Sequence, residues 1–110
     1  MPEGRFDKGR PLAYGIAMEF EWDEAKSSAC FKRRGFDFAY AVRAFLDPHR
    51  IVAQDRRRDY GEDRYRLLGT VDGCAYVVVY TVRGSAVRII SARKANGKEV
   101  ADYEHNARQD

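Results

Sequence analysis

The chain has 110 residues, a length that is enough for one domain with its own core and too short for two. Of these residues, 45% are hydrophobic and 34% are charged. Twenty Lys and Arg against 17 Asp and Glu give a net charge of +3, so charge alone does not establish a nucleic-acid-binding protein. No segment is long enough for a transmembrane helix, and the N-terminus lacks the apolar region of a signal peptide. We therefore expect a cytoplasmic protein that does not contact a membrane.

The two cysteines, Cys30 and Cys74, lie far apart in the sequence. There is no Cys-x-x-Cys motif, and no His/Cys cluster has the spacing of metal ligands. We expect both thiols to be reduced, and we expect neither a structural metal nor a cofactor.

The first 17 residues are rich in Gly, Pro and charge and show no sustained periodicity, which predicts a flexible arm. We expect a single domain over residues 18–106. It begins with a short strand over residues 18–22, where apolar and acidic residues alternate.

Two helices follow this strand. The first is expected over residues 24–34, between Asp23 as N-cap and Gly35 as the residue that ends it. The second has Asp37 as its N-cap, and five apolar residues follow at the i, i+3, i+4, i+7, i+8 spacing of a buried stripe. These are Phe38, Ala41, Val42, Phe45 and Leu46.

The hydrophobic period then changes to that of strands. Four are expected, over residues 51–54, 64–71, 74–82 and 86–93, and the third is apolar enough for a central position. Asp72-Gly73 between two of them is a strong hairpin signal.

A last helix follows the strands. Asn96 and Glu99 form a capping-box pattern at its start, and Val100 and Tyr103 are expected to face inward. The predicted fold is α+β, with a short N-terminal strand, two helices, a four-stranded antiparallel meander and a C-terminal helix.

Four cations lie on or just after the predicted strands: Arg64, Arg88, Arg93 and Lys94. Arg64 begins the second strand of the meander and Arg93 ends the fourth. These strands run parallel two places apart, so the two residues should lie at opposite ends. Arg64 and Arg88 can share a face. Convergent cations can bind a scissile phosphate and stabilise its transition state, but the residues alone favour the alternative of solvated strand ends.

A second candidate is the loop that contains Arg56, Arg57, Arg58 and Tyr60. Its arginines could follow a phosphate backbone while Tyr60 stacks on a base. Acidic residues are interleaved with them, so a solvated, internally paired loop is at least as well supported.

Two further residues could transfer protons. His49 lies at a helix-to-strand junction near Asp47, where it is either a general acid or base or an ordinary surface residue. Glu62 is a weaker candidate for a base.

Five segments together resemble the BrnT family, toxins of type II toxin–antitoxin modules, over nearly the whole chain after the arm. They are residues 20–26 (FEWDEAK), 35–38 (GFDF), 47–50 (DPHR), 61–65 (GEDRY) and 88–95 (RIISARKA). The resemblance implies a RelE-like α+β fold and an endoribonuclease that arrests translation. It also implies neutralisation by a BrnA-like antitoxin, through which the complex contacts promoter DNA.

The resemblance gives the cations a role, because RelE-like ribonucleases use Arg, Lys and sometimes Tyr to cleave RNA without a metal. Attack by the 2′-hydroxyl leaves a 2′,3′-cyclic phosphate. The residues that match the family motif and are expected to be catalytic are Arg64, Arg88 and Arg93, followed by Lys94 and His49. The expected RNA-binding residues are Arg56, Arg57, Tyr60, Lys26 and Arg34.

The chain departs from the family pattern in its first helix, where Cys30 replaces Asn and Arg34 replaces His. The missing His favours an alternative function, that of an inactive toxin homologue which binds the antitoxin as a transcriptional co-repressor. A plain nucleic-acid-binding module is a third, more distant hypothesis.

Overall fold

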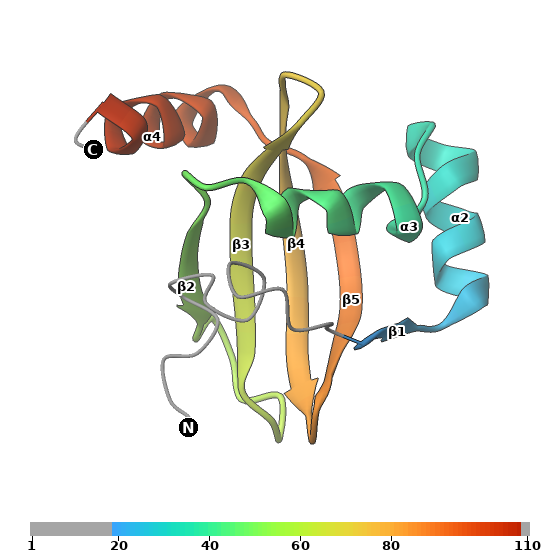
Figure 1. Cartoon of the computed structure of the whole chain (residues 1–110). Coiled ribbons are helices and arrows are strands. Elements are labelled where there is room, and N and C mark those ends of the chain that lie inside the picture. The colour runs from blue at the N-terminus through green and yellow to red at the C-terminus, as the bar shows by residue number, and fades with distance from the viewer. Residues whose placement is uncertain (1–18, 109–110) are drawn as a thin grey trace.

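The computed structural model describes residues 19–108 (Figure 1). In chain order its elements are β1 (Glu19–Trp22), α2 (Glu24–Arg34), α3 (Phe38–Ala41), the 3-10 helix η1 (Val42–Leu46), β2 (Ile51–Asp55), β3 (Arg64–Val71), β4 (Cys74–Arg83), β5 (Ala86–Lys94) and α4 (Gly97–Arg108). The predicted arm over residues 1–17 lies outside the described residues. Within residues 19–108, no helix is long and apolar enough to cross a membrane.

The strands form one five-stranded sheet in the order β1-β5-β4-β3-β2. Strands β2 to β5 make the predicted antiparallel meander, and the apolar β4 is central as predicted. The prediction of a purely antiparallel four-stranded sheet was incomplete. Strand β1 joins β5 in parallel, with Glu19 opposite Ala86, which makes the sheet mixed. Alternation identifies a strand but not its partner, which here is more than 60 residues away in the sequence.

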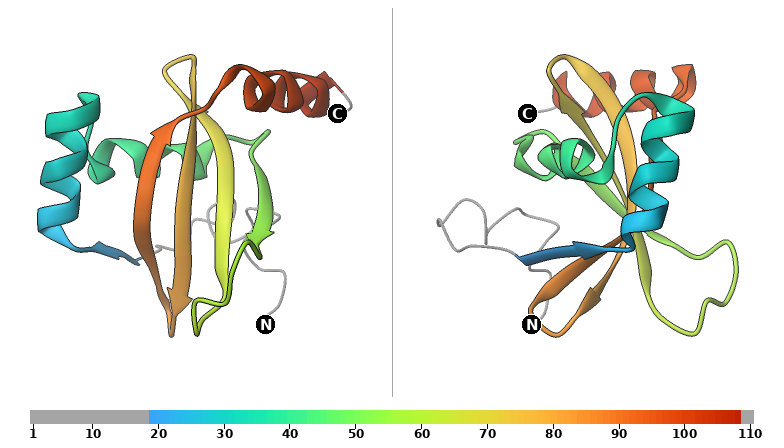
Figure 2. Two further views of the ribbon diagram at one scale, coloured as in Figure 1. Left: turned by 180° about the vertical axis from the view of Figure 1, so that it is seen from behind. Right: turned by 90° about the vertical axis from the view of Figure 1, so that its right-hand side faces the viewer.

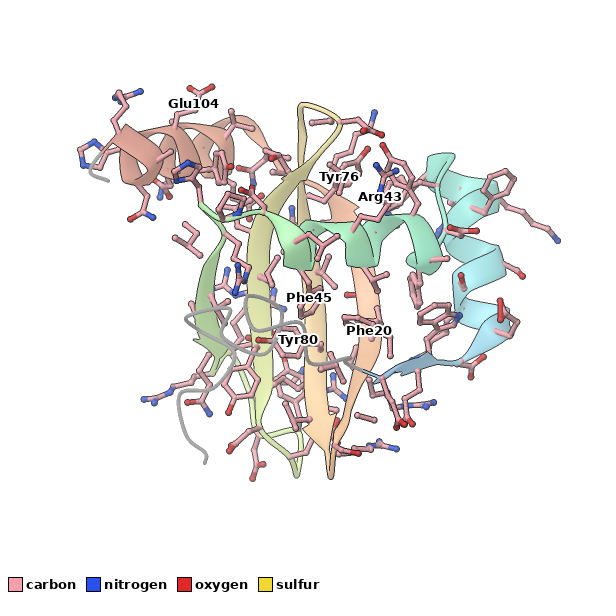
Figure 3. All side chains as sticks on the ribbon, in the orientation of Figure 1. Phe20, Arg43, Phe45, Tyr76, Tyr80 and Glu104 are labelled. Carbon is pink, nitrogen blue, oxygen red and sulfur yellow. The ribbon has the colours of Figure 1, made fainter. Side chains whose placement is uncertain are left out.

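One face of the sheet is covered by α3 and η1, and most of the core lies there. Phe45 of η1 packs with ring-centre distances of 5.0 Å to Phe20 and 5.1 Å to Tyr80, joining the helical layer to β1 and β4 (Figure 3). These edge-to-face aromatic pairs add to the hydrophobic burial of the rings.

The ends of α2 follow the prediction. The Asp23 carboxylate accepts hydrogen bonds from the backbone N–H groups of Ala25 and Lys26, and Gly35 ends the helix at φ = 88°. Ser27 was not expected to matter, yet it is buried and its hydroxyl accepts a hydrogen bond from the Phe38 N–H at 3.0 Å. This bond joins the middle of α2 to the start of α3.

The second predicted helix is α-helical only to Ala41 and continues as the 3-10 helix η1. Phe38, Ala41 and Phe45 are buried as predicted, but Leu46 is 66% exposed, so its predicted burial was wrong. A 3-10 helix has three residues per turn instead of 3.6, which rotates the last residue of the apolar stripe away from the sheet.

Helix α4 packs on the opposite face of the sheet, near one end of the strands (Figure 2). The predicted capping box is present, because the Asn96 and Glu99 side chains each accept the other's backbone N–H, at 2.8 and 2.9 Å. Val100 and Tyr103 face inward as predicted and pack against Leu68 and its neighbours. The Tyr103 hydroxyl also donates to the buried carboxylate of Asp47.

Gly69 lies where η1 packs tightly against the sheet, because a Cβ on this residue would lie 2.8 Å from the Ala44 carbonyl oxygen. We predict that Gly69→Ala lowers the free energy of unfolding by about 1–3 kcal/mol, since backbone must move to make room. Urea unfolding followed by circular dichroism measures this change. Gly97→Ala is the control, because a Cβ there meets no atom within 4 Å. Equal stability of the two variants would show that the contact is not tight.

Candidate functional site

Besides Arg83 at the end of β4, which contacts Glu62 at 3.6 Å, the sheet face opposite α3 and η1 carries four arginines, Arg64 and Arg66 on β3 and Arg88 and Arg93 on β5. Their sequence neighbours Tyr65, Leu67, Val87 and Ala92 belong to the core on the other face, and side chains alternate along a strand. We call this surface, defined by the four arginines, the arginine face.

The strand register places these residues relative to one another. Arg88 pairs with Thr81, and Tyr65, the residue after Arg64, pairs with Tyr80, so Arg64 and Arg88 lie at the same level on either side of β4. Two strand spacings separate their backbones by roughly 10 Å. Arg93 pairs with Val77, nearer the other end of the sheet. The predictions that Arg64 and Arg88 share a face, and that Arg64 and Arg93 lie at opposite ends, are both confirmed.

A β-bulge decides which side of the sheet the end of β5 presents. Tyr80 pairs with Ile89 but Val79 pairs with Ser91, so Ile90 is an extra residue on β5. The bulge turns Ser91 and Arg93 to the same face as Arg88. With strict alternation, Lys94 would have faced that side and Arg93 the core side.

The β2–β3 loop projects on the side of the arginine face, at the end of the sheet away from α4 (Figure 2). A hydrogen bond of 2.6 Å from the Thr81 hydroxyl to the Asp63 carbonyl oxygen attaches the loop to β4. Within it, Arg57 donates two hydrogen bonds of 2.9 Å to the buried carboxylate of Asp55. The Arg64 guanidinium lies 4.2 Å from the ring centre of Tyr60, a cation–π contact. Arg57 and Tyr60 are thus connected to the arginine face.

Each strand-borne arginine except Arg66 forms an ion pair with a carboxylate. Arg64 contacts Glu62 at 3.1 Å, and Arg88 contacts Glu21 at 3.4 Å. These partly exposed pairs contribute little to stability, so a phosphate can replace the carboxylate at small cost.

The third pair is stronger, because Arg93 donates two parallel hydrogen bonds of 2.8 Å to Glu99 of α4. The Arg93 guanidinium lowers the pKa of Glu99 to about 2, and the Asn96 N–H and the charge of Arg66 act in the same direction. Glu99 in turn raises the pKa of Arg93, while the like charge of Arg57 opposes that rise. Arg66 and Arg93 therefore both act on the Glu99 carboxylate.

The other predicted site residues lie outside the arginine face. Lys94 faces the core side of the sheet and, with Arg34, lines a hollow at the outer edge of β5. Lys26 and Arg34 line a neighbouring hollow that also includes Ser91, so these α2 cations border the arginine face at its β5 edge. Arg56 is exposed and donates to Gln54. His49 is exposed in the turn before β2, where its N–H donates to Asp47.

Sequence reasoning missed Arg66 and the role of Glu99 as the partner of Arg93. The same two-residue spacing that places Arg64 on this face also places Arg66 there, so that signal was available. Cys30 is buried, and its thiol lies 3.6 Å from the Ala92 carbonyl oxygen, so this residue belongs to the core. Among residues 19–108, no three His, Cys, Asp or Glu side chains are placed to bind a metal ion.

Comparison with known proteins identifies one family. A family model described as "Ribonuclease toxin, BrnT, of type II toxin-antitoxin system" matches residues 22–99, well over half of the chain. The match includes all four residues of the arginine face and ends at Glu99. No curated protein sequence matches the chain.

The Arg93–Glu99 pair predicts a specific pH dependence. The pKa of Glu99 falls from 4.5 to about 2 on folding, so its contribution to stability is complete above pH 4.5 and is lost as the pH falls toward 2. We predict that Glu99→Gln lowers the free energy of unfolding by about 1–3 kcal/mol at pH 7, and that the difference shrinks between pH 4.5 and 2. Chemical denaturation across this range measures it.

The control is Glu104→Gln, which removes an exposed carboxylate on the outer side of α4 (Figure 3). This variant should match the wild type at each pH. A Glu99→Gln effect that stays constant from pH 7 to pH 2 would contradict the assignment.

Proposed function

The chain belongs to the BrnT family of ribonuclease toxins of type II toxin–antitoxin systems, and on this premise we propose that the arginine face is the site that cleaves RNA. One observation carries the proposal. Arg64, Arg66, Arg88 and Arg93 share one sheet face, the β2–β3 loop with Arg57 lies beside it, and only one end of that face is covered by a helix. The surface is open, rigid and cationic, which suits a polyanion.

The proposed reaction is attack by a 2′-hydroxyl oxygen on the adjacent phosphorus. The new bond closes a 2′,3′-cyclic phosphate, and the bond to the 5′-oxygen breaks to give a 5′-hydroxyl. We assign Arg64 and Arg88, which lie on either side of Thr81, to binding the phosphate and stabilising the charge of the transition state. Arg93 is the third cationic residue.

Proton transfer requires an acceptor near these cations. Glu62 contacts Arg64 at 3.1 Å and Arg83 at 3.6 Å, so this carboxylate lies beside the proposed phosphate position. We assign it as the base that accepts the 2′-hydroxyl proton, while the leaving 5′-oxygen takes a proton from water. The assigned groups are all side chains, so the proposed mechanism is independent of a metal.

The cations around the arginine face suggest how an RNA strand extends beyond the cleaved bond. At one end, Arg56, Arg57 and Tyr60 offer charge and an aromatic ring, a combination that binds single-stranded RNA. At the β5 edge, Lys26 and Arg34 line the hollow next to Ser91. We assign these residues to binding the strand and not to the chemical step. Lys94 and His49 lie away from Arg64 and Arg88 and are the weaker catalytic candidates.

A type II toxin has an antitoxin partner. We propose a BrnA-like antitoxin that neutralises this chain, with promoter DNA contacted through the antitoxin. Phe31 and Leu46, which are 57% and 66% exposed, are large apolar side chains available for such a contact.

One observation favours the alternative function of an inactive co-repressor. Arg34 stands where the resemblance leads us to expect His and lies at the β5 edge, where a guanidinium supplies charge but not a general acid or base. The products of incubation with RNA separate the hypotheses, because a nuclease leaves cyclic-phosphate ends and a co-repressor leaves the RNA intact.

We predict that Arg64→Ala and Arg93→Ala each slow RNA cleavage by about 10²–10³-fold, because each removes a cation that stabilises the transition state. Both should relieve the growth arrest that follows induction in bacterial cells. Arg43→Ala is the control, since Arg43 lies on η1 and pairs with Asp72 at the surface. Full toxicity of both folded variants would refute the site assignment.

A further inference from the structure

A hollow of about 340 Å³ lies beside the arginine face, between β2 and α4. Its apolar lining includes Ile51, Ala53, Leu68 and Val77, and its polar lining consists of Arg66, Glu99 and Asp102. This volume is at the lower end of the range for small-molecule sites and is of the size that suits one nucleobase rather than a larger ligand.

Arg66 stands out among the side chains of this hollow. Its Nε is buried and has no hydrogen-bond partner within the described part of the chain. The other three residues of the arginine face each have a carboxylate partner. A buried donor without a partner is uncommon and calls for an explanation, such as a ligand that completes its hydrogen bonds.

The carboxylates of the hollow differ in availability. Glu99 is occupied by Arg93 and by the Asn96 N–H. Asp102 is 60% exposed, and its ion pair with Lys98 is long, at 3.6 Å. The hollow thus presents a cationic donor from β3, an available acceptor from α4, and an apolar surface from β2, β3 and β4.

We propose that this hollow binds a guanine base of the RNA substrate, with Arg66 and Asp102 determining the specificity. Guanine O6 and N7 accept the two parallel hydrogen bonds that a guanidinium donates. Its N1–H and 2-amino group donate to a carboxylate, and its ring contacts the apolar surface. The proposal rests on the proposed function, because it assigns a base subsite to that cleavage site.

The other bases match this pair of groups less well. Adenine presents a 6-amino donor beside N7, where the arginine also donates, and its N1 is an acceptor that faces the carboxylate. Cytosine offers one donor group and uracil one N–H, and both have a smaller ring for the apolar surface. Only guanine offers two acceptors to Arg66 and two donor groups to Asp102.

Binding of uncleavable oligonucleotides tests the proposal independently of catalysis. The probes are 2′-O-methyl uridine hexanucleotides with one internal G, A, C or inosine, measured by fluorescence anisotropy with the full chain. We expect the G probe to bind about tenfold more tightly than the A probe, as one well-formed bidentate contact provides. The inosine probe, which lacks the 2-amino group, should lie between them.

Arg66→Ala and Asp102→Asn should each reduce the G-to-A preference to within about twofold. Arg66→Ala also removes a cation that favours the ionised Glu99, so its thermal unfolding temperature is measured beside the binding to show that the variant is folded at the assay temperature. Arg43→Ala and Glu104→Gln are the matched controls, one arginine and one carboxylate outside the hollow, and both should keep the wild-type preference.

Three outcomes would overturn the proposal. The wild type could bind all probes equally, or bind none measurably. The G preference could also survive both Arg66→Ala and Asp102→Asn. A parallel digest of unmodified RNA distinguishes this failure from that of the proposed function. Cleavage without base preference refutes the guanine subsite and leaves the nuclease. Preferential binding of the G probe without cleavage supports the subsite and refutes the nuclease.

Discussion

The ion pair between Arg93 and Glu99 attaches the start of α4 to the end of β5, and much of the surface depends on that placement. Helix α4 has no fully buried residue, and its apolar contact with the sheet comes mainly from the half-buried Val100 and Tyr103. Glu99 adds two short hydrogen bonds from Arg93 and the capping bond from the Asn96 N–H. These bonds attach the start of the helix to the end of β5.

The same ion pair leaves most of the arginine face open. Because α4 is attached at one end of the sheet, it forms a wall of the hollow beside Arg66 and leaves the region around Val79 and Ser91 accessible. Glu99 neutralises the charge of Arg93, one of the cations of the arginine face. The positive charge of the arginine face is therefore partly balanced by carboxylates.

The sheet combines rigidity with cationic chemistry by using its two faces differently. One face of β3, β4 and β5 is buried under α3 and η1, so the backbone that carries Arg64, Arg88 and Arg93 is fixed by the core. A site on packed strands is positioned more accurately than one on loops. Repulsion among the arginines is offset by Glu21, Glu62 and Glu99, each from a different element.

Features with a short-range cause could be predicted from the sequence. Asp23 and Gly35 limit α2 because a cap acts on the helix next to it, and the Asp72-Gly73 hairpin arises from two residues with positive φ. The apolar composition of β4 predicted its central place. Leu46 was predicted incorrectly, because its exposure depends on the change to a 3-10 helix, which the apolar spacing does not reveal.

In the candidate site, too, some features could be predicted from the sequence and others depend on the tertiary structure. The sequence by itself indicated that Arg64 and Arg93 lie toward opposite ends of the sheet, because this follows from the order of a meander. It allowed Arg64 and Arg88 to share a face, and the strand register places them there. Only the tertiary structure decided that Arg93, and not Lys94, faces the same side as Arg88. This outcome depends on a bulge between β4 and β5. The tertiary structure also brought Glu99, Arg57 and the hollow beside Arg66 close to Arg93. These residues belong to different elements, and they become neighbours only when the loop and α4 pack on the sheet.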